Sequence, residues 1–307
     1  MSSEHGLLKK LTVLTRPIGR SGQIQGHAMV TRSLLAGLTQ LGIPFNYNPS
    51  SKGDIGDVIV VLANVDALAQ AIAIKRENRS IILLAGPNLV VWPTDDKGIL
   101  LSSEIDGVIV PSGPTRHMYA EISPSIKDRL FIWYAGIDTN QWKPFTTDKG
   151  RDVLVYWKNQ REGQLLKNNV VDLLKKYNWN PVVLEYGRYN QNRYKEILNS
   201  ASFGIFLSRS ESQGIALAEA WAMDVVTFPW NPKYRVNRGR VYSAVSSCPY
   251  LTDQTGKDWK EITELECILK DFDRGNDQYS PRQWILGAMT DAISAQLLID
   301  IVKKFRQ

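Results

Sequence analysis

The sequence predicts an α/β protein made of two domains, each built around a parallel sheet, and three observations support this prediction. Short apolar runs of strand length alternate along the chain with segments of helical pattern, as parallel sheets with helical crossovers require. The chain has 307 residues, a length that favours two domains. A polar stretch at Phe145–Gly150 separates the two series of elements, so we place a linker near Lys143–Arg151.

The first half of the chain predicts a complete set of alternating elements. Strands are expected at residues 11–15, 44–47, 57–62, 80–85, 107–112 and 130–133. Helices are expected at residues 27–40, 67–78 and 115–121, the first of them ending near Gly42. A glycine-rich loop lies between the first strand and the first helix, and Gly22 and Gly26 would allow a ligand to approach the backbone there. This loop does not match the G-x-G-x-x-G fingerprint, which argues against nicotinamide binding.

The second half repeats the same alternation. Strands are expected at residues 152–156, 181–186, 203–207 and 225–228, and helices at 162–177 and 194–199. A long final helix is predicted to begin after Ser280, which suits an N-cap, with Pro281 at the first helical position. Its apolar stripe is an expected packing surface and comprises Ile285, Met289, Ile293, Gln296, Leu297, Ile301 and Phe305.

Composition excludes several classes of protein. Apolar residues make up 43% of the chain, which is ordinary for a globular protein, and the longest apolar runs are far too short to span a membrane. The N-terminus lacks the features of a signal peptide. Only Cys248 and Cys267 carry thiols, so we expect free cysteines in a reducing cytoplasm. The three histidines show no ligand spacing and no Asp-x-Asp pair occupies a metal-binding position, so we expect no metal.

The most informative segment is Ser208–Met223, which follows the buried strand expected at 203–207. Glu211 falls in a loop and Glu219 lies eight positions later, inside the second turn of an Ala- and Leu-rich helix. The backbone amides expected to open this helix belong to Ser212, Gln213, Gly214 and Ile215. A helix N-terminus binds phosphate, and the flanking carboxylates are good acceptors for sugar hydroxyls. The segment therefore predicts a site for a sugar nucleotide.

This segment resembles the E-x7-E motif of retaining glycosyltransferases with the GT-B fold, especially the family-4 group. The residues in register are Ser208, Arg209, Glu211, Gly214, Glu219, Ala220 and Ala222. The chain departs from the family at Asp224–Phe228, where Gly-x-Pro-Val is usual. Tyr134–Pro144 resembles the segment that precedes the interdomain linker in these enzymes, and Pro249–Gly256 resembles a late part of their second domain.

The resemblance implies a GT-B architecture of two Rossmann-like domains. It assigns residues 1–145 to an acceptor-side domain and 151–280 to a nucleotide-sugar domain, with a C-terminal helix at 281–307 that crosses back to the first domain. It implies transfer of a sugar from a UDP- or GDP-linked donor to an acceptor hydroxyl with retention of configuration. A metal ion or other cofactor is not expected.

The same resemblance suggests roles for individual residues. Lys158 and Arg161 are the expected cations for the diphosphate, although their order and spacing differ from the family pattern. Glu219 would accept hydrogen bonds from the ribose, and Glu211 from hydroxyls of the donor sugar. His117 is a weaker candidate for contact with the sugar, and His27, beside the glycine-rich loop, is a comparable one.

Several alternatives remain open from the sequence. The acceptor is a glycan, a lipid-linked molecule, a small molecule or modified DNA, and the oligomeric state is open. The net charge of +6 fits a nucleoside diphosphate ligand and an anionic acceptor or a membrane surface that holds the protein peripherally. The basic run Lys233–Arg240 is interpreted either as a solvated loop or as a surface that binds nucleic acid. A nucleotide-sugar epimerase and a non-catalytic binding protein of the same fold are the other functional classes.

Overall fold

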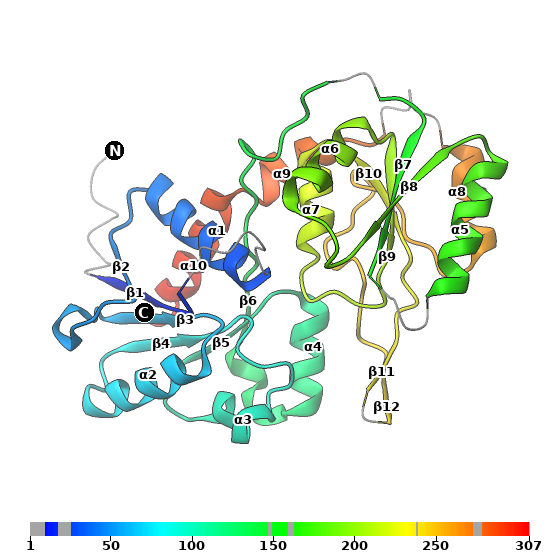
Figure 1. Cartoon of the computed structure of the whole chain (residues 1–307). Coiled ribbons are helices and arrows are strands. Elements are labelled where there is room, and N and C mark those ends of the chain that lie inside the picture. The colour runs from blue at the N-terminus through cyan, green and yellow to red at the C-terminus, as the bar shows by residue number, and fades with distance from the viewer. Residues whose placement is uncertain are drawn as a thin grey trace. The chain divides into compact units, whose positions relative to one another are not determined.

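The computed structural model describes residues 10–17, 26–146, 149–158, 163–237, 239–272 and 278–306. The chain divides into two compact units. Unit 1 takes the described residues up to Gly136 and those from Asp291 onward, and unit 2 takes Ile137–Thr290. Figure 1 shows both units as sheets covered by helices, which confirms the predicted α/β class with parallel sheets.

Unit 1 is built on a six-stranded parallel sheet with the order β2-β1-β3-β4-β5-β6. The strands are β1 (Leu11–Leu14), β2 (Phe45–Tyr47), β3 (Val58–Val61), β4 (Ile82–Ala85), β5 (Gly107–Val110) and β6 (Leu130–Ile132). The central strands are apolar along their whole length because helices cover both faces of the sheet.

The helices of unit 1 form two layers (Figure 1). They are α1 (Gly26–Gln40), α2 (Val65–Glu77), α3 (Asp95–Gly98), α4 (Gly113–Ile122) and α10 (Asp291–Lys303), with 3-10 turns at Lys52–Asp54, Ile99–Leu101 and Pro124–Arg129. Helix α10 packs on α1, and the other helices lie on the opposite face of the sheet. Close approach of α10 requires a glycine at Gly37 of α1, because a methyl group there would overlap the carbonyl oxygen of Asp291.

Side chains at the end of the unit 1 sheet hold α10 in place. The Trp133 indole donates a hydrogen bond of 2.8 Å to the carbonyl of Ser294, whose hydroxyl donates to the carbonyl of Tyr134 at 2.5 Å. Phe305 packs edge-on against Phe131 of β6, with ring centroids 5.3 Å apart. The C-terminal helix therefore returns to the first unit, as expected.

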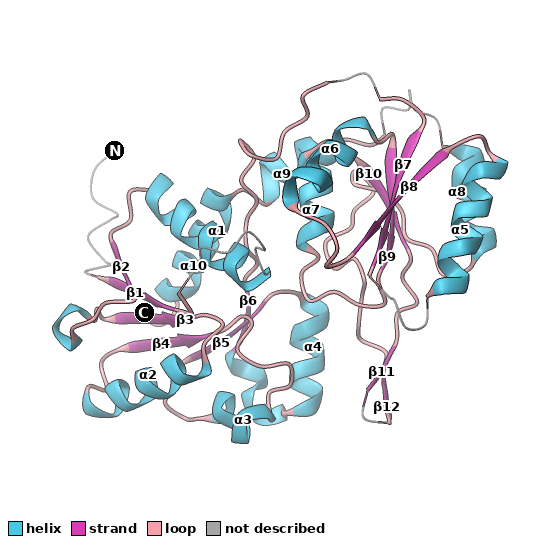
Figure 2. Ribbon diagram, in the orientation of Figure 1, coloured by secondary structure: helices cyan, strands magenta, loops and turns pink. Residues whose placement is uncertain are grey.

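Unit 2 has a four-stranded parallel sheet with the order β10-β9-β7-β8 (Figure 2). The strands are β7 (Asp152–Trp157), β8 (Asn180–Glu185), β9 (Phe203–Leu207) and β10 (Val226–Pro229). The helices are α5 (Gln164–Lys176), α6 (Gln191–Ser200), α7 (Ile215–Ala222), α8 (Ile262–Asp271) and α9 (Pro281–Ala288). Helices α5 and α8 cover one face, and α6 and α7 cover the other. A separate hairpin, β11 (Arg235–Asn237) and β12 (Arg240–Tyr242), follows β10.

The prediction of one long helix at the end of the chain is wrong. Helix α9 ends at Ala288 and α10 begins at Asp291, so the break falls where the chain leaves unit 2. Ile137 donates to the carbonyl of Met289 at 2.9 Å and forms a bridge with Thr290, so the backbone at the break pairs with another segment. The break shifts the buried stripe of α10, and Gln296 of the predicted stripe is exposed.

The division between the units lies a few residues before the predicted linker. Residues 137–146 belong to unit 2 because Trp142 is buried there, with its ring 5.7 Å from that of Tyr194. Arg282 of α9 donates to the carbonyl of Trp142 at 2.9 Å. Both cysteines are free thiols. In the part of the chain that the structure describes, no helix combines the length and apolar character needed to cross a membrane.

Candidate nucleotide-sugar site

The candidate site lies at the carboxyl ends of the two central strands of unit 2. The strand order reverses between β7 and β9, because the chain goes from β7 outward to β8 and then returns to the other side of β7. Open α/β sheets bind ligands at such a switch point. Lys158 follows β7 directly and Ser208 follows β9, and the Lys158 amide donates to the carbonyl of Leu207 at 3.1 Å.

An ion pair joins the two loops at this point. The Lys158 Nζ lies 2.8 Å from both carboxylate oxygens of Glu211. The Ser208 hydroxyl donates to Glu211 Oε1 at 2.7 Å, and the Glu211 amide donates to the carbonyl of Ser246 at 2.8 Å. The side chains of Lys158 and Glu211 are 32% and 16% exposed, so the pair is partly shielded from water. The structure thus brings two predicted site residues into direct contact.

The loop after β9 ends at Gly214, which is the N-cap of α7. Gly214 has a φ of +83°, a left-handed conformation that favours glycine, and it supplies no side-chain cap. The Gly214 carbonyl accepts the first helical hydrogen bond, from Ala218 at 3.1 Å. Ser212 is exposed beside Gly214, whereas Gln213 is buried. The uncapped N-terminus of α7, which begins at Ile215, is the feature that the sequence predicted for holding phosphate.

Glu219 lies one turn further along α7 and is buried. Only 6% of the residue is exposed, and burial raises the pKa of its carboxyl group to about 8. Among the residues that the structure describes, none donates a hydrogen bond to this carboxyl group. A buried acceptor without a donor in the protein is costly, so Glu219 is suited to accept hydrogen bonds from a ligand.

Four tyrosines around the site were missed by the sequence analysis. The Tyr189 hydroxyl donates to that of Tyr156 at 3.0 Å, and the Tyr194 hydroxyl donates to the carbonyl of Ala216 in α7 at 2.6 Å. Burial raises the pKa of Tyr189 to about 12 and that of Tyr194 well above its usual value, and the charge of Glu219 adds to both shifts. Tyr186 lies under Lys158, whose Nζ is 4.8 Å from the ring centroid.

Arg209 also lies in this loop and was noted in the sequence only as part of the motif. Its guanidinium is 5.2 Å from the ring centroid of Trp230 and 5.1 Å from that of Tyr234. Cation–π contacts of this kind hold the loop against the segment that follows β10. The aromatic residues at 230 and 234, next to a basic run, were the available signal in the sequence.

The remaining predicted residues are distributed as follows. Gly22 and Arg161 lie outside the described residues. Gly26 is the first residue of α1, and His117 is an exposed residue of α4, so both belong to unit 1. In the described part of the chain, no group of three or more His, Cys, Asp or Glu side chains could hold a metal ion.

Comparison with solved structures defines the fold. No protein-family model and no curated protein sequence matches the chain. The chain is similar to the lipopolysaccharide outer core galactosyltransferase WaaB in its apo form, with a TM-score of 0.63 at 11% identity. The match covers 96% of this chain and 99% of WaaB. The chain is also similar, over 97% of its length, to 99% of sucrose-phosphate synthase from Thermosynechococcus elongatus, with a TM-score of 0.57 at 12% identity. The chain therefore has the GT-B fold.

A third solved structure of similar fold is named as an epimerase and not as a glycosyltransferase. It is the UDP-GlcNAc 2-epimerase from Methanocaldococcus jannaschii, matched over 96% of this chain and 99% of that one, with a TM-score of 0.50 at 9% identity. At identities this low the similarity shows the fold alone, so the function has to be argued from the site.

Proposed function

We propose that the protein is a retaining glycosyltransferase that transfers a sugar from a nucleoside diphosphate sugar to an acceptor hydroxyl without a metal ion. The observation that carries the proposal is the contact between Lys158 and Glu211 at the switch point of unit 2, beside the uncapped N-terminus of α7. A cation, helix amides and acidic acceptors lie at the carboxyl edge of the unit 2 sheet. They suit the diphosphate, the ribose and the sugar of such a donor.

Each part of the donor has a partner in this arrangement. The Lys158 ammonium and the amides at Gly214 and Ile215 would bind the diphosphate, with Arg161 as the second predicted cation. Glu219 would accept hydrogen bonds from the ribose hydroxyls, because it is a buried acceptor without a donor in the described protein. Glu211 would turn from Lys158 to the hydroxyls of the donor sugar once the diphosphate engages that lysine.

The chemistry proposed for this site is displacement on one face of the sugar. The bond between the anomeric carbon and the phosphate oxygen breaks, and the acceptor oxygen bonds to the same carbon from the same face. The acceptor proton passes to the departing phosphate. Negative charge develops on the diphosphate in the transition state, so Lys158 and the α7 amides stabilise it where it forms. His117 in α4 stays a predicted contact for the sugar.

Nucleotide binding tests the proposal directly. Calorimetry with UDP, GDP and ADP should identify one tight ligand, and Lys158→Ala should weaken its binding about tenfold or more because a charge-assisted contact is lost. Lys176→Ala is the matched control, because Lys176 of α5 forms an ion pair with Glu266 of α8 at the same distance of 2.8 Å. Equal effects of the two substitutions would remove Lys158 from the site.

The second candidate function is a nucleotide-sugar epimerase, favoured by the likeness to the archaeal 2-epimerase. Product analysis separates the two. A transferase forms a new glycoside and free nucleoside diphosphate only when acceptor is present, whereas an epimerase converts the donor alone. A protein that binds the nucleotide but turns over neither substrate would instead be a binding protein of this fold.

A further inference from the structure

A short segment of unit 2, Ser246–Cys248, contacts the backbone of the candidate site. The Glu211 amide donates a hydrogen bond of 2.8 Å to the carbonyl of Ser246. The carboxylate of Glu211 contacts Lys158 and Ser208 at the switch point. The position of the Ser246 carbonyl therefore influences where the Glu211 backbone lies, and with it the place of the carboxylate.

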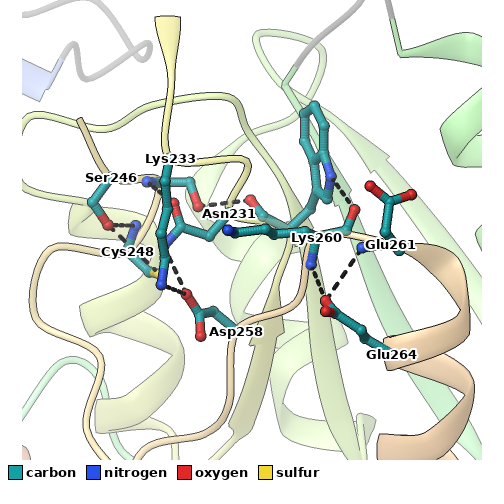
Figure 3. Close-up of polar contacts among 10 residues, drawn as sticks. Asn231, Lys233, Ser246, Cys248, Asp258, Lys260, Glu261 and Glu264 are labelled. Atoms are coloured by element: carbon teal, nitrogen blue, oxygen red, sulfur yellow. Dashed lines mark hydrogen bonds and ion pairs between the residues drawn. The ribbon is translucent and has the colours of Figure 1, made fainter. Parts of the chain in front are cut away.

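The side chain of Asn231, just after β10, holds the Ser246–Cys248 segment in place. Its Oδ1 atom accepts from the Ser247 amide at 3.1 Å, and its Nδ2 atom donates to Asp258 Oδ2 at 2.8 Å. Its backbone amide donates to the carbonyl of Trp259 at 2.8 Å. Figure 3 shows the polar contacts around Asn231. One residue thus joins the end of β10 to two segments that are distant in the sequence.

Asparagine is the residue type that suits this position. The Ser247 amide can only donate, and the Asp258 carboxylate, which also pairs with Lys233 at 3.3 Å, can only accept. A carboxamide offers one acceptor and one donor group, so it satisfies both partners. Asn231 is 3% exposed, so losing either contact would leave a buried polar group without a partner.

The Ser246 carbonyl and the Ser247 amide belong to a single peptide unit. Such a unit is planar, and in the trans form its C=O and N–H bonds point in opposite directions. Asn231 binds this unit at its N–H, and Glu211 binds it at its C=O. Any rotation of the plane after loss of the Asn231 side chain would therefore misplace the acceptor of the Glu211 amide.

We propose that Asn231 is a positioning residue for the donor sugar. Through the Ser246–Ser247 peptide unit it holds Glu211 where the carboxylate meets the sugar hydroxyls. This inference rests on the proposed function, in which Glu211 binds the sugar and Lys158 binds the diphosphate. Because Asn231 acts on the backbone of Glu211, its loss should weaken the contact with the sugar and spare the contact with the diphosphate.

Hydrogen exchange of the full chain, measured by mass spectrometry, tests the contact without a ligand. Asn231→Ala should raise the exchange rate of the peptide that contains Glu211 about tenfold, whereas peptides from β9 should keep their protection. Asp258→Ala leaves Asn231 in place and should raise the rate about threefold. Ser202→Ala is the control, because the buried Ser202 hydroxyl donates to the carbonyl of Gly150 just before β9, away from the site. Exchange of the Glu211 peptide at the wild-type rate in Asn231→Ala would overturn the proposal.

Calorimetry separates positioning from a general loss of stability. The probes are UDP, GDP and ADP and their conjugates UDP-glucose, GDP-mannose and ADP-glucose, and the pair that the wild type binds most tightly is used. In Asn231→Ala the ratio of the conjugate Kd to the diphosphate Kd should rise about tenfold, since a hydrogen bond to a charged group is weakened. The Kd of the diphosphate alone should change by less than about threefold, and Ser202→Ala should change neither quantity. Thermal unfolding of every variant checks that the fold is intact.

A double-mutant cycle with Glu211→Gln identifies the residue through which Asn231 acts. Glu211→Gln should itself raise the ratio, and Asn231→Ala should have no further effect in that background, because the sugar contact is already weakened. Additive effects of the two substitutions would overturn the proposal, and so would equal weakening of the diphosphate and the conjugate in Asn231→Ala.

The positioning role and the proposed function can fail separately. Diphosphate binding at the wild-type level in Lys158→Ala would refute the proposed site, whatever Asn231→Ala does. Weaker diphosphate binding in Lys158→Ala, together with an unchanged ratio in Asn231→Ala, would refute the positioning role alone. A ratio that does not respond to Glu211→Gln would remove the sugar contact that both proposals assume.

Discussion

Glu219 is the residue at which burial, charge and ligand binding can be tested together. Its folded pKa of about 8 lies above the usual 4.5 for this carboxyl group, so the folded protein keeps a proton that the unfolded chain releases. Between pH 4.5 and 8 the folded state holds more protons than the unfolded state, so the free energy of unfolding falls as pH rises. The difference between the folded and the unfolded pKa corresponds to a total change of roughly 4 to 5 kcal/mol in the free energy of unfolding.

Glu219→Gln removes this titration and leaves the shape of the side chain. We expect the free energy of unfolding of the variant, relative to wild type, to rise by about 4 kcal/mol between pH 5 and pH 9. Urea unfolding at several pH values measures it, and other titrating groups cancel in the comparison. Glu196→Gln is the control, because that side chain is 64% exposed. Parallel pH profiles for Glu219→Gln and wild type would refute the buried-carboxyl argument.

The same variant tests the role of Glu219 in binding. Ribose hydroxyls donate to the ionised carboxylate, so nucleotide affinity of the wild type should increase as pH rises toward 8. The variant should bind about 10- to 100-fold more weakly at alkaline pH, since a hydrogen bond to a charged group is worth about 1.5–3 kcal/mol. Unchanged calorimetric affinity across this range would contradict the ribose assignment even if the stability result holds.

Three further predictions concern the backbone and the metal-free proposal. Gly214→Val should weaken nucleotide binding and lower the free energy of unfolding by about 1–2 kcal/mol, because valine does not adopt a φ of +83° without strain. Nucleotide binding at the wild-type level in this variant would show that the α7 N-terminus does not contact the ligand. Gly37→Ala should destabilise unit 1 by about 1–3 kcal/mol in denaturant unfolding, because the added methyl group pushes α10 away from α1. Gly113→Ala is the control and should be nearly neutral, because its added methyl group meets open space. EDTA should leave sugar transfer unchanged, and a large loss restored by Mg²⁺ would overturn the proposal of a metal-free reaction.

The alternation of strands and helices was predictable because periodicity is a local property of the sequence. The strand at Phe203–Leu207 matches the prediction at both ends, since an unbroken apolar run bounded by Ser202 and Ser208 leaves little freedom for other boundaries. The helix after Gly214 follows from the same local signals. The fold class needed only these patterns and the length of the chain.

The parts that the sequence did not predict depend on contacts between distant residues. The break at Met289–Thr290 is imposed by pairing with Ile137, so an amphipathic pattern alone could not show it. The tyrosines around α7 come from β7, from the loop between β8 and α6, and from α6 itself, and only the folded sheet brings them together. The β11–β12 hairpin was missed because its strands have only three residues each and lie in a basic run, so the sequence shows no strand pattern of recognisable length there.

The discontinuity of unit 1 has a consequence for how the protein is made. Helix α10 packs on α1 and is tied to the carbonyl of Tyr134, yet the ribosome synthesises all of Ile137–Thr290 before it reaches this helix. Unit 2 is contiguous and can fold as soon as it emerges, while the nascent first unit waits with the surface around Gly37 uncovered. During translation the second unit should therefore become protease-resistant before the first.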